Sequence, residues 1–357
     1  MLGTVVDDEL GVNWHATTFA VRPHRGVPGQ NVAVLVHRPG TLGTRHGLDD
    51  AAAGTAPSTG AVFDAAAGDV GHPFPTECGR RAVLYVHGFQ DYFFHPHLAR
   101  AWEEAGFTFF ALDLRGCGRA WDGAAEVGRV DDLRAYGDDL MRAVHMIRSA
   151  GAQQVVINAH SMGALLVTVW THAFPEAVDA LVLNSPWLDL SGGRAAKRLQ
   201  RAAIRATAAV NRQAVLAVLH GTNSASLHYS TGGEFRFSLA RKILSGAPAR
   251  AGFLSSVVAA QDAVAAGLEL PLPVLVCHSD QSELGLKIGS RKDTAEIDAD
   301  LVLDVEAIAK RAMGLGPKVE VAVIPGGKHD LALSSPEVRA NYFARITQWA
   351  SAVLPKL

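Results

Sequence analysis

The sequence predicts an α/β fold, in which a mostly parallel sheet carries helices on both faces and an inserted helical cap. The main observation is that short apolar, β-branched runs alternate with amphipathic helical patterns from Arg81 onward. Such alternation favours parallel strands joined by right-handed crossovers. It stops between Trp187 and Leu270, where two Ala-rich helical stretches take over, and then resumes. A helical insertion between strands is the pattern expected of a cap.

The composition is that of a globular protein with a large core. The chain has 357 residues, of which 48% are hydrophobic and 19% charged, and its formal net charge is −2. This balance does not point to nucleic acid or an anionic membrane as a partner. The cysteines, Cys78, Cys117 and Cys277, are scattered and odd in number, which argues against a disulfide framework. Because neither a secretory signal pattern nor a bilayer-length apolar run is evident, we expect a cytoplasmic location.

The chain divides into two parts of one core and the cap between them. We expect the first part of the core, the cap and the second part at residues 1–186, 187–270 and 271–357. In the first part, Trp14–Val21 and Asn31–His37 read as antiparallel strands joined by a turn rich in Pro and Gly. The stretch 39–78 is rich in Gly, Ala, Pro, Ser and Asp without periodicity, so we expect an irregular surface excursion.

The alternating elements follow in order, assigned from apolar period and length. Strands of the parallel sheet are expected at 82–86, 107–112, 155–157, 180–184, 273–278 and 319–324. Helices of the core are expected at 97–105, 131–149, from Ser161 to about 174, and at 305–313 and 336–353. The cap is expected to contain helices at 194–219 and 253–265, and a polar loop is expected at 279–298.

The most informative stretch is Val155–Gly163. A β-branched run is followed at once by small residues around Ser161 and then by an apolar helical pattern. A strand, a sharp turn and a helix with serine at the apex form a nucleophile elbow. The residues two before and two after the serine must be small, which Gly163 satisfies fully and Ala159 with a methyl group. Ser161 is therefore the candidate nucleophile.

A serine nucleophile needs a base, and the base needs a carboxylate that orients it. His329 follows the last predicted strand in the Gly-rich loop Pro325–Asp330, which can bend inward. The reactive groups of an open α/β sheet gather beyond the carboxyl ends of its strands, where Ser161 also lies. His329 is therefore the candidate base.

The carboxylate is a choice among several candidates. Asp300 precedes a short apolar run and then a helix, whereas Asp280 lies directly at the end of the strand 273–278. We favour Asp300 and keep Asp280 as the alternative acid, which would otherwise anchor its loop. Asp304 has the position of an N-cap for the helix that follows.

The negative charge that develops on a substrate oxygen needs preorganised N–H groups. We expect one from Met162, directly after the serine, and one from Phe89 in the loop after the strand 82–86. His87 is expected to fix that loop by hydrogen bonding rather than to react. The aromatic stretch Tyr92–Phe94 could line an acyl pocket or pack in the core.

The chain resembles the monoglyceride lipase and lysophospholipase branch of the α/β-hydrolases, which is also grouped with the serine aminopeptidase-like hydrolases. The resemblance rests on four motifs: His87–Phe89, Asp113–Gly118, Ala159–Gly163 and Gly326–His329. It extends from about Arg81 to the C-terminus. Ala159 in place of glycine and Cys117 in place of the frequent histidine or aromatic residue depart from the pattern. The resemblance implies a cofactor-free serine hydrolase that acts on carboxylic esters, often acylglycerols or lysophospholipids.

We therefore expect an enzyme, a serine carboxylic ester hydrolase of the esterase or lipase type that passes through an acyl-enzyme on Ser161. A thioesterase, an amidase or an acyltransferase could use the same groups. A non-catalytic binding module of the same fold is the alternative from another class. The expected partner is a small-molecule or lipid-like ester.

Two further groups of residues are expected to have structural roles. His87, His95 and His97 lack a carboxylate or cysteine at ligand spacing, so we expect no metal site. Arginines at helical spacing are expected to form a solvated cap surface; they are Arg194, Arg198, Arg201, Arg205 and Arg212. The alternative is a transient contact of this stripe with a membrane surface, in which the side of the helix that carries Leu199, Ile204 and Val210 faces the active site.

Overall fold

The structure is a computed structural model that describes most of the chain. The described residues are 5–25, 27, 31–42, 77–123, 126–219, 221–285 and 294–357. Most of the surface excursion expected at 39–78 lies outside these residues, as does part of the polar loop expected at 279–298.

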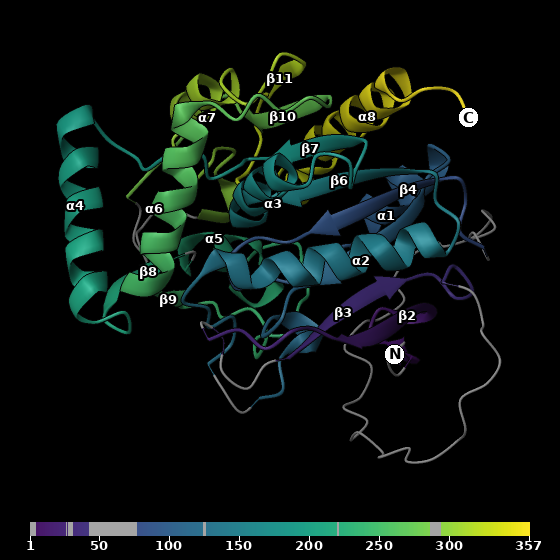
Figure 1. Ribbon diagram of the computed structural model, residues 1–357, viewed down its shortest axis with the longest axis horizontal. Helices are drawn as coiled ribbons and strands as arrows, with labels where there is room; N and C mark the ends of the chain where they lie inside the picture. Colours follow the sequence, from purple (N-terminus) through teal and green to yellow (C-terminus); the bar gives the residue numbers. More distant parts are fainter. Residues whose placement is uncertain are drawn as a thin grey trace.

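A nine-stranded sheet forms the centre of the described structure (Figure 1). Its strands are β1 (Val5–Asp8), β2 (Gly11–Ala20), β3 (Val32–His37), β4 (Arg81–Val86), β5 (Thr108–Asp113), β6 (Gln154–His160), β7 (Ala180–Asn184), β10 (Val274–Ser279) and β11 (Val319–Ile324). Their order across the sheet is β1-β2-β3-β5-β4-β6-β7-β10-β11. The pairs from β1 to β5 are antiparallel and those from β5 to β11 parallel. The mostly parallel sheet is confirmed, and β1 is an edge strand that the sequence did not lead us to expect.

Helices cover both faces of the sheet, as expected (Figure 1). One face carries α2 (Gly137–Ser149), α3 (Ser161–Ala173), α6 (Ala251–Ala266) and α7 (Val305–Ala312). The other face carries α1 (Pro96–Glu104) and α8 (Pro336–Val353). Short 3₁₀ turns are η1 (Gly118–Ala120), η2 (Leu133–Tyr136), η3 (Tyr229–Thr231), η4 (Thr294–Glu296) and η5 (Leu331–Leu333).

The central strands contribute side chains to both layers of core. Along β6, Val155 and Ile157 pack with α2 and α3, whereas Val156 packs with α1 and α8. Every residue of β6 is buried. Burial on both faces explains why the central strands read as continuous apolar runs and not as alternating ones.

Between β7 and β10 the chain leaves the sheet and forms an insertion. In chain order it contains α4 (Arg194–Val210), β8 (Val215–Leu219), α5 (Gly221–Leu227), η3, β9 (Ala247–Arg250) and α6. The helix expected over 194–219 is wrong in its last part, because α4 ends at Val210 and Asn211 Oδ1 accepts the Gln213 N–H (2.9 Å) in a turn. The apolar run of β8 then pairs antiparallel with β9, which suits its β-branched residues.

Helix α4 packs alongside α6 through polar contacts (Figure 1). Arg201 donates to Asp262 Oδ1 on α6 (2.5 Å) and to Asp189 Oδ1 in the segment before α4 (2.7 Å). Leu199 and Val210 are 73% and 91% exposed. The alternative in which Leu199, Ile204 and Val210 face the active site is therefore wrong for Leu199 and Val210, whereas Ile204 packs partly buried against the core. The expected solvated arginine stripe is wrong at Arg201, because its ion pairs turn this side of the helix inward.

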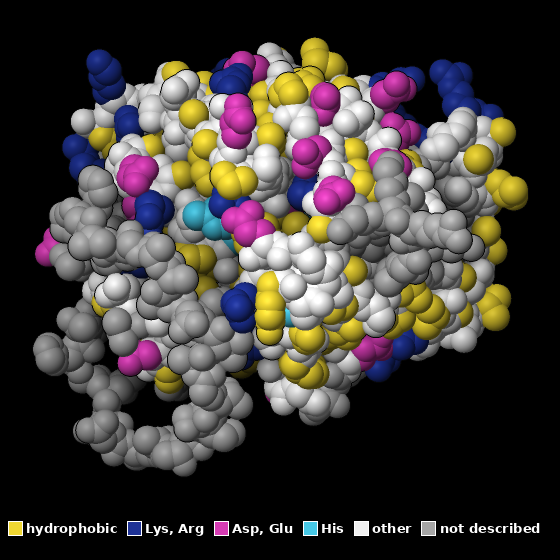
Figure 2. Space-filling model, turned by 180° about the vertical axis from the view of Figure 1, so that it is seen from behind, with side chains coloured by type: hydrophobic (Ala, Val, Ile, Leu, Met, Phe, Trp, Pro, Cys, Tyr) yellow, Lys and Arg dark blue, Asp and Glu magenta, His cyan; other side chains and the backbone are white. Residues whose placement is uncertain are grey.

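The surface carries charges of both signs. On the face seen in Figure 2, Lys and Arg side chains are interspersed with Asp and Glu. This distribution fits the formal net charge of −2. Among the helices in the described part of the chain, none combines the length and apolar character that crossing a membrane requires.

Candidate active site

Ser161 lies at a sharp turn between β6 and α3. It is the first residue of α3 and has φ +52°, a left-handed conformation that residues other than glycine rarely adopt. Gly163 permits the turn, since a Cβ at this position would lie 2.2 Å from the carbonyl oxygen of His87. Ala159 is fully buried in the core, where its methyl group fits. The turn has the strained geometry expected of a nucleophile elbow.

Ser161, His329 and Asp300 form a hydrogen-bonded chain. His329 Nδ1 donates to Asp300 Oδ2 over 2.9 Å, and Ser161 Oγ lies 3.0 Å from His329 Nε2. Because a carboxylate only accepts, Nδ1 carries the ring proton and Nε2 accepts from the serine hydroxyl. The three residues are 1%, 0% and 0% exposed, respectively. The structure thus brings together the serine, the base and the favoured acid expected from the sequence.

Asp300 reaches this point although a polar loop separates it from β10. Its N–H donates to Gln281 O (3.0 Å) and its carbonyl oxygen accepts the Glu283 N–H (2.9 Å), which fixes it close to the end of the strand. Its Oδ1 accepts the N–H groups of Val302 and Leu303, both at 2.8 Å. These two backbone donors leave the other carboxylate oxygen directed at the imidazole.

The other two carboxylates have different partners. Asp280 Oδ1 accepts the Gly326 N–H (2.9 Å) and so holds the loop that leads to His329. Asp304 Oδ1 accepts the N–H groups of Glu306 and Ala307 at 3.1 and 3.2 Å. The role of Asp304 as the N-cap of α7 is confirmed.

The loop after β4 packs directly on the serine turn. A Cβ at Gly88 would lie 3.1 Å from the ring of His160 and 3.3 Å from Ser161 Cβ. His87 fixes this loop, as expected, because the Leu114 N–H donates to its Nε2 (3.0 Å) and its Nδ1 donates to Gly88 O (2.7 Å). Burial lowers the pKa of His87 and thereby favours the neutral ring that these two hydrogen bonds require.

The two residues expected to provide N–H donors lie on either side of this contact. Phe89 follows Gly88, and its ring stacks on Phe253 with the centroids 4.6 Å apart. Met162 lies in the first turn of α3, where backbone N–H groups have no acceptor within the helix. Both side chains are buried.

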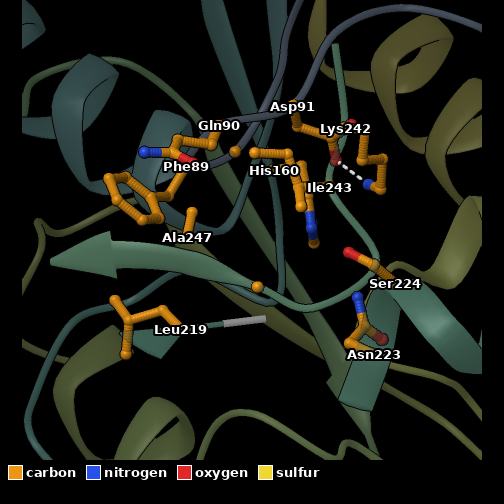
Figure 3. Close-up of a pocket in the computed structure, with 12 residues that line it drawn as sticks. Phe89, Gln90, Asp91, His160, Leu219, Asn223, Ser224, Lys242, Ile243 and Ala247 are labelled. Atoms are coloured by element: carbon orange, nitrogen blue, oxygen red, sulfur yellow. Dashed lines mark hydrogen bonds and ion pairs between the residues drawn. The ribbon is translucent and has the colours of Figure 1, made fainter. Parts of the chain in front are cut away.

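A small polar pocket lies between this loop and the insertion (Figure 3). Its lining combines loop and elbow residues with residues of the insertion: Gly88, Phe89, Gln90, Asp91, His160, Leu219, Asn223, Ser224, Lys242, Ile243, Gly246 and Ala247. In this arrangement the pocket has room for little more than a water molecule. Lys242 pairs with Asp91, so the charges of this ion pair cancel.

The imidazole of His329 has a second ring beside it. His160 meets His329 edge to face with centroids 4.8 Å apart, and burial lowers the pKa of His160 to about 4. Burial acts to raise the pKa of Asp330, but His160, His95 and Lys242 outweigh it and lower that pKa to about 2. At neutral pH, His329 therefore lies beside a neutral imidazole, and the carboxylate of the neighbouring residue Asp330 is charged.

The aromatic stretch after the loop packs in the protein interior. Tyr92 and Phe94 form a small cluster with Leu227, Phe237 and Leu333, and Phe93 belongs to the core layer that packs with α1 and α8. Of the two alternatives expected for Tyr92–Phe94, the contacts favour packing. In the described residues, no group of three His, Cys, Asp or Glu side chains could hold a metal ion.

Several residues that line the pocket were not expected from the sequence. They are Gln90, Asp91, Asn223, Ser224 and Lys242. Asp91 lies two residues after Phe89, and this proximity was the available signal. Asn223, Ser224 and Lys242 lie in the insertion, where no strand end or Gly-rich turn marks a site in the sequence.

The mostly parallel sheet and the serine turn beyond β6 define an α/β-hydrolase. The chain belongs to the serine aminopeptidase S33 family of hydrolases, whose model matches residues 77–337. The matched region begins just before β4 and ends in the first turn of α8. It therefore includes the serine turn, the insertion and the loop that carries His329.

Two curated relatives match shorter parts of the chain. A probable lysophospholipase L2 from Haemophilus influenzae is 26% identical over 117 residues, which are 32% of this chain and 37% of that protein. The uncharacterized protein YnbC from Escherichia coli is 34% identical over 89 residues, which are 22% of this chain and 14% of that protein. The chain thus matches well under half the length of either relative.

Solved structures share the fold over most of the chain. A soluble variant of monoglyceride lipase from Saccharomyces cerevisiae, in complex with a substrate analog, has a TM-score of 0.59 at 12% identity. That likeness covers 94% of this chain and 97% of the other. Monoacylglycerol lipase from Paleococcus ferrophilus has a TM-score of 0.57 at 14% identity. The likeness covers 78% of this chain and 97% of the lipase chain. At these identities the likeness shows the fold.

Proposed function

We propose that the chain is a serine hydrolase that cleaves carboxylic esters through an acyl-enzyme on Ser161. The observation that carries this proposal is the buried hydrogen-bonded chain from Ser161 through His329 to Asp300. A serine hydroxyl becomes an effective nucleophile when an oriented base can take its proton, and this chain provides the base and the orienting carboxylate.

The proposed reaction has two halves. Ser161 Oγ attacks the ester carbonyl while His329 Nε2 takes its proton, and Asp300 stabilises the imidazolium. The N–H groups of Phe89 and Met162 hold the oxyanion, each contributing about 3 kcal/mol to transition-state stabilisation. His329 returns the proton to the leaving alkoxide, and the acyl group remains on Ser161. Water, deprotonated by the same imidazole, then attacks the acyl-enzyme and releases the carboxylic acid and free Ser161.

The proposed substrate is a lipid-like ester such as an acylglycerol or a lysophospholipid. The insertion at 187–270 is proposed to act as a cap that covers the bound substrate. A probable lysophospholipase among the sequence relatives and monoglyceride and monoacylglycerol lipases among the structural ones support this class. Because Lys242 is already paired with Asp91, the pocket between the Phe89 loop and the insertion is proposed to favour a neutral head group. We therefore expect faster hydrolysis of a monoacylglycerol than of lysophosphatidic acid with the same acyl chain.

A fluorophosphonate probe tests the central proposal. The folded protein should gain one phosphonyl group on Ser161, located by peptide mass spectrometry, and Ser161→Ala should gain none at that site and should not hydrolyse nitrophenyl esters. Absence of labelling in the folded protein would favour the binding-module alternative. A nitrophenyl ester, a thioester and an anilide with the same acyl group separate esterase from thioesterase and amidase, and an added alcohol detects acyl transfer.

A further inference from the structure

The loop that carries Phe89 is fastened to the insertion by a buried ion pair. Lys242 Nζ contacts Asp91 Oδ2, and the two side chains are 6% and 8% exposed (Figure 3). The partners are 151 residues apart in the chain. Asp91 lies two residues after Phe89, so the contact acts close to the expected oxyanion donor.

Both members of the pair are held by further contacts. Lys242 Nζ lies 5.2 Å from the centroid of Phe94 and 5.6 Å from that of Phe237, a cation–π environment with little water. Asp91 Oδ1 accepts the Tyr92 N–H at 2.9 Å. Burial acts to raise the pKa of Asp91, but the Lys242 ammonium outweighs it and lowers that pKa. The carboxylate is therefore charged, and removal of its partner would leave a charge in the protein interior.

The same region connects the loop to the base. The Ser238 N–H of the insertion donates to the hydroxyl of Tyr92 at 2.7 Å. Tyr92 also packs in the small cluster that includes Phe237 from the insertion and Leu333, four residues after His329. Three segments that surround the site thus share one small core.

The loop itself is strained and depends on such outside contacts. Gln90, between Phe89 and Asp91, has φ +47°, and its side-chain Oε1 is buried without a hydrogen-bond partner among the described residues. A left-handed residue of this kind costs about 1–3 kcal/mol and persists when its surroundings hold it. The ion pair lies directly next to Gln90 and is placed to supply that restraint.

We propose that Lys242 is a positioning residue for the oxyanion hole: its ion pair with Asp91 holds the Phe89 N–H in place against Ser161. This role rests on the proposed serine hydrolase. Lys242 acts on the transition state through the loop and not by contact with the reacting atoms, so its loss should lower kcat more than it changes KM.

The test compares Lys242→Met, Lys242→Arg and the double variant Asp91→Asn/Lys242→Met with the wild type. Lys242→Met should lower kcat on a nitrophenyl ester and the rate of fluorophosphonate labelling by about 10- to 100-fold, with KM within about threefold. Lys242→Arg, which keeps the ion pair, should retain most of the activity. The double variant should regain thermal stability, because no unpaired charge is buried, but should not regain kcat.

Arg38→Met provides the matched control, since Arg38 and Glu103 form an ion pair of similar burial away from the site. It should lower stability and leave the kcat of the folded protein unchanged. If the double variant recovers both stability and kcat, Lys242 has only a structural role. The same conclusion follows if Lys242→Met folds and its kcat is unchanged. If the fluorophosphonate probe does not label the wild-type protein, the proposed hydrolase function is wrong, and the proposed role of Lys242 is wrong with it.

Discussion

Gly163 and His87 lie so close that a single methyl group could not fit between them. A Cβ on Gly163 would lie 2.2 Å from the His87 carbonyl oxygen and 3.0 Å from that of Val86. These atoms belong to backbone and cannot rotate away. The separation between the serine turn and the end of β4, which leads to the expected oxyanion loop, is therefore set by the absence of a side chain at Gly163.

Gly163→Ala should push these two segments apart. We expect kcat to fall at least about 100-fold, because small displacements of reacting groups have large effects, and the free energy of unfolding to fall by about 1–3 kcal/mol. Ester hydrolysis and thermal unfolding measure the two effects. Gly137→Ala in α2 is the control: its Cβ would meet Trp170 at an ordinary 3.7 Å, so stability should stay level or rise and activity should persist. Full activity in Gly163→Ala would show that the elbow can relax.

Asp300→Asn should remove the charge that orients and stabilises the imidazole. We expect kcat on a nitrophenyl ester to fall by about 10³- to 10⁴-fold, with the folded structure retained because the amide oxygen can still accept the Val302 and Leu303 N–H groups. Asp280→Asn, which affects the Gly326 contact, should lower kcat by less than about tenfold. A deep loss in Asp280→Asn alone would reverse the assignment of the acid.

His95 should make the fold sensitive to acid. Its ring nitrogens are buried without hydrogen-bond partners among the described residues, and burial lowers the pKa of His95 to about 3 from the ordinary 6.5. The unfolded chain therefore takes up a proton first as pH falls, and stability present above pH 6.5 is lost on the way to pH 3. For one such residue, the free energy of unfolding changes by at most about 1.4 kcal/mol per pH unit.

His95→Phe should reduce this slope, since the ring remains among Tyr85, Phe93 and Phe94 without the titrating group. Urea unfolding between pH 7 and pH 5 compares the two proteins. Equal slopes in both would mean that His95 is protonated to the same extent in the folded and unfolded states.

Asp189 should anchor α4 to the rest of the protein. Its carboxylate contacts Lys197 at 3.1 Å, Arg201 at 2.7 Å and Arg311 at 2.9 Å, and its side chain is 5% exposed. Asp189→Asn should lower the free energy of unfolding by about 1–3 kcal/mol, because three cations lose their shared partner.

Asp262→Asn is the control for this prediction, since Asp262 also pairs with Arg201 but its side chain is 39% exposed. It should change stability by less than about 1 kcal/mol. Denaturant unfolding followed by circular dichroism measures both variants. Equal effects would mean that burial of Asp189 adds nothing to the anchoring.

The sheet and the positions of Ser161 and His329 could be predicted because each depends on a short, local pattern. A buried strand followed by small residues predicts a turn at its carboxyl end, and the parallel sheet brings such ends together. Asp300 could be favoured from its apolar run, but its position depends on hydrogen bonds with Gln281 and Glu283 across a polar loop.

What could not be predicted depends on partners far away in the chain. The apolar run of β8 reads as a continuation of the preceding helix until β9 is available to pair with it. The inward side of α4 carries Arg201, which pairs with Asp189 and with Asp262 on another helix. Lys242 lies in a segment with no periodic signal, and its role depends on its contact with Asp91, which is 151 residues away in the chain.

If the substrate occupies the pocket between the Phe89 loop and the insertion, the small size of that pocket has a consequence for rates. It has room for little more than a water molecule, so an ester could enter it only after part of the lining had moved. Only the fraction of molecules that are open at any moment can bind, and the apparent dissociation constant rises as that fraction shrinks. A change that favours the closed form would therefore raise the melting temperature and lower kcat/KM together, with no alteration at Ser161, His329 or Asp300.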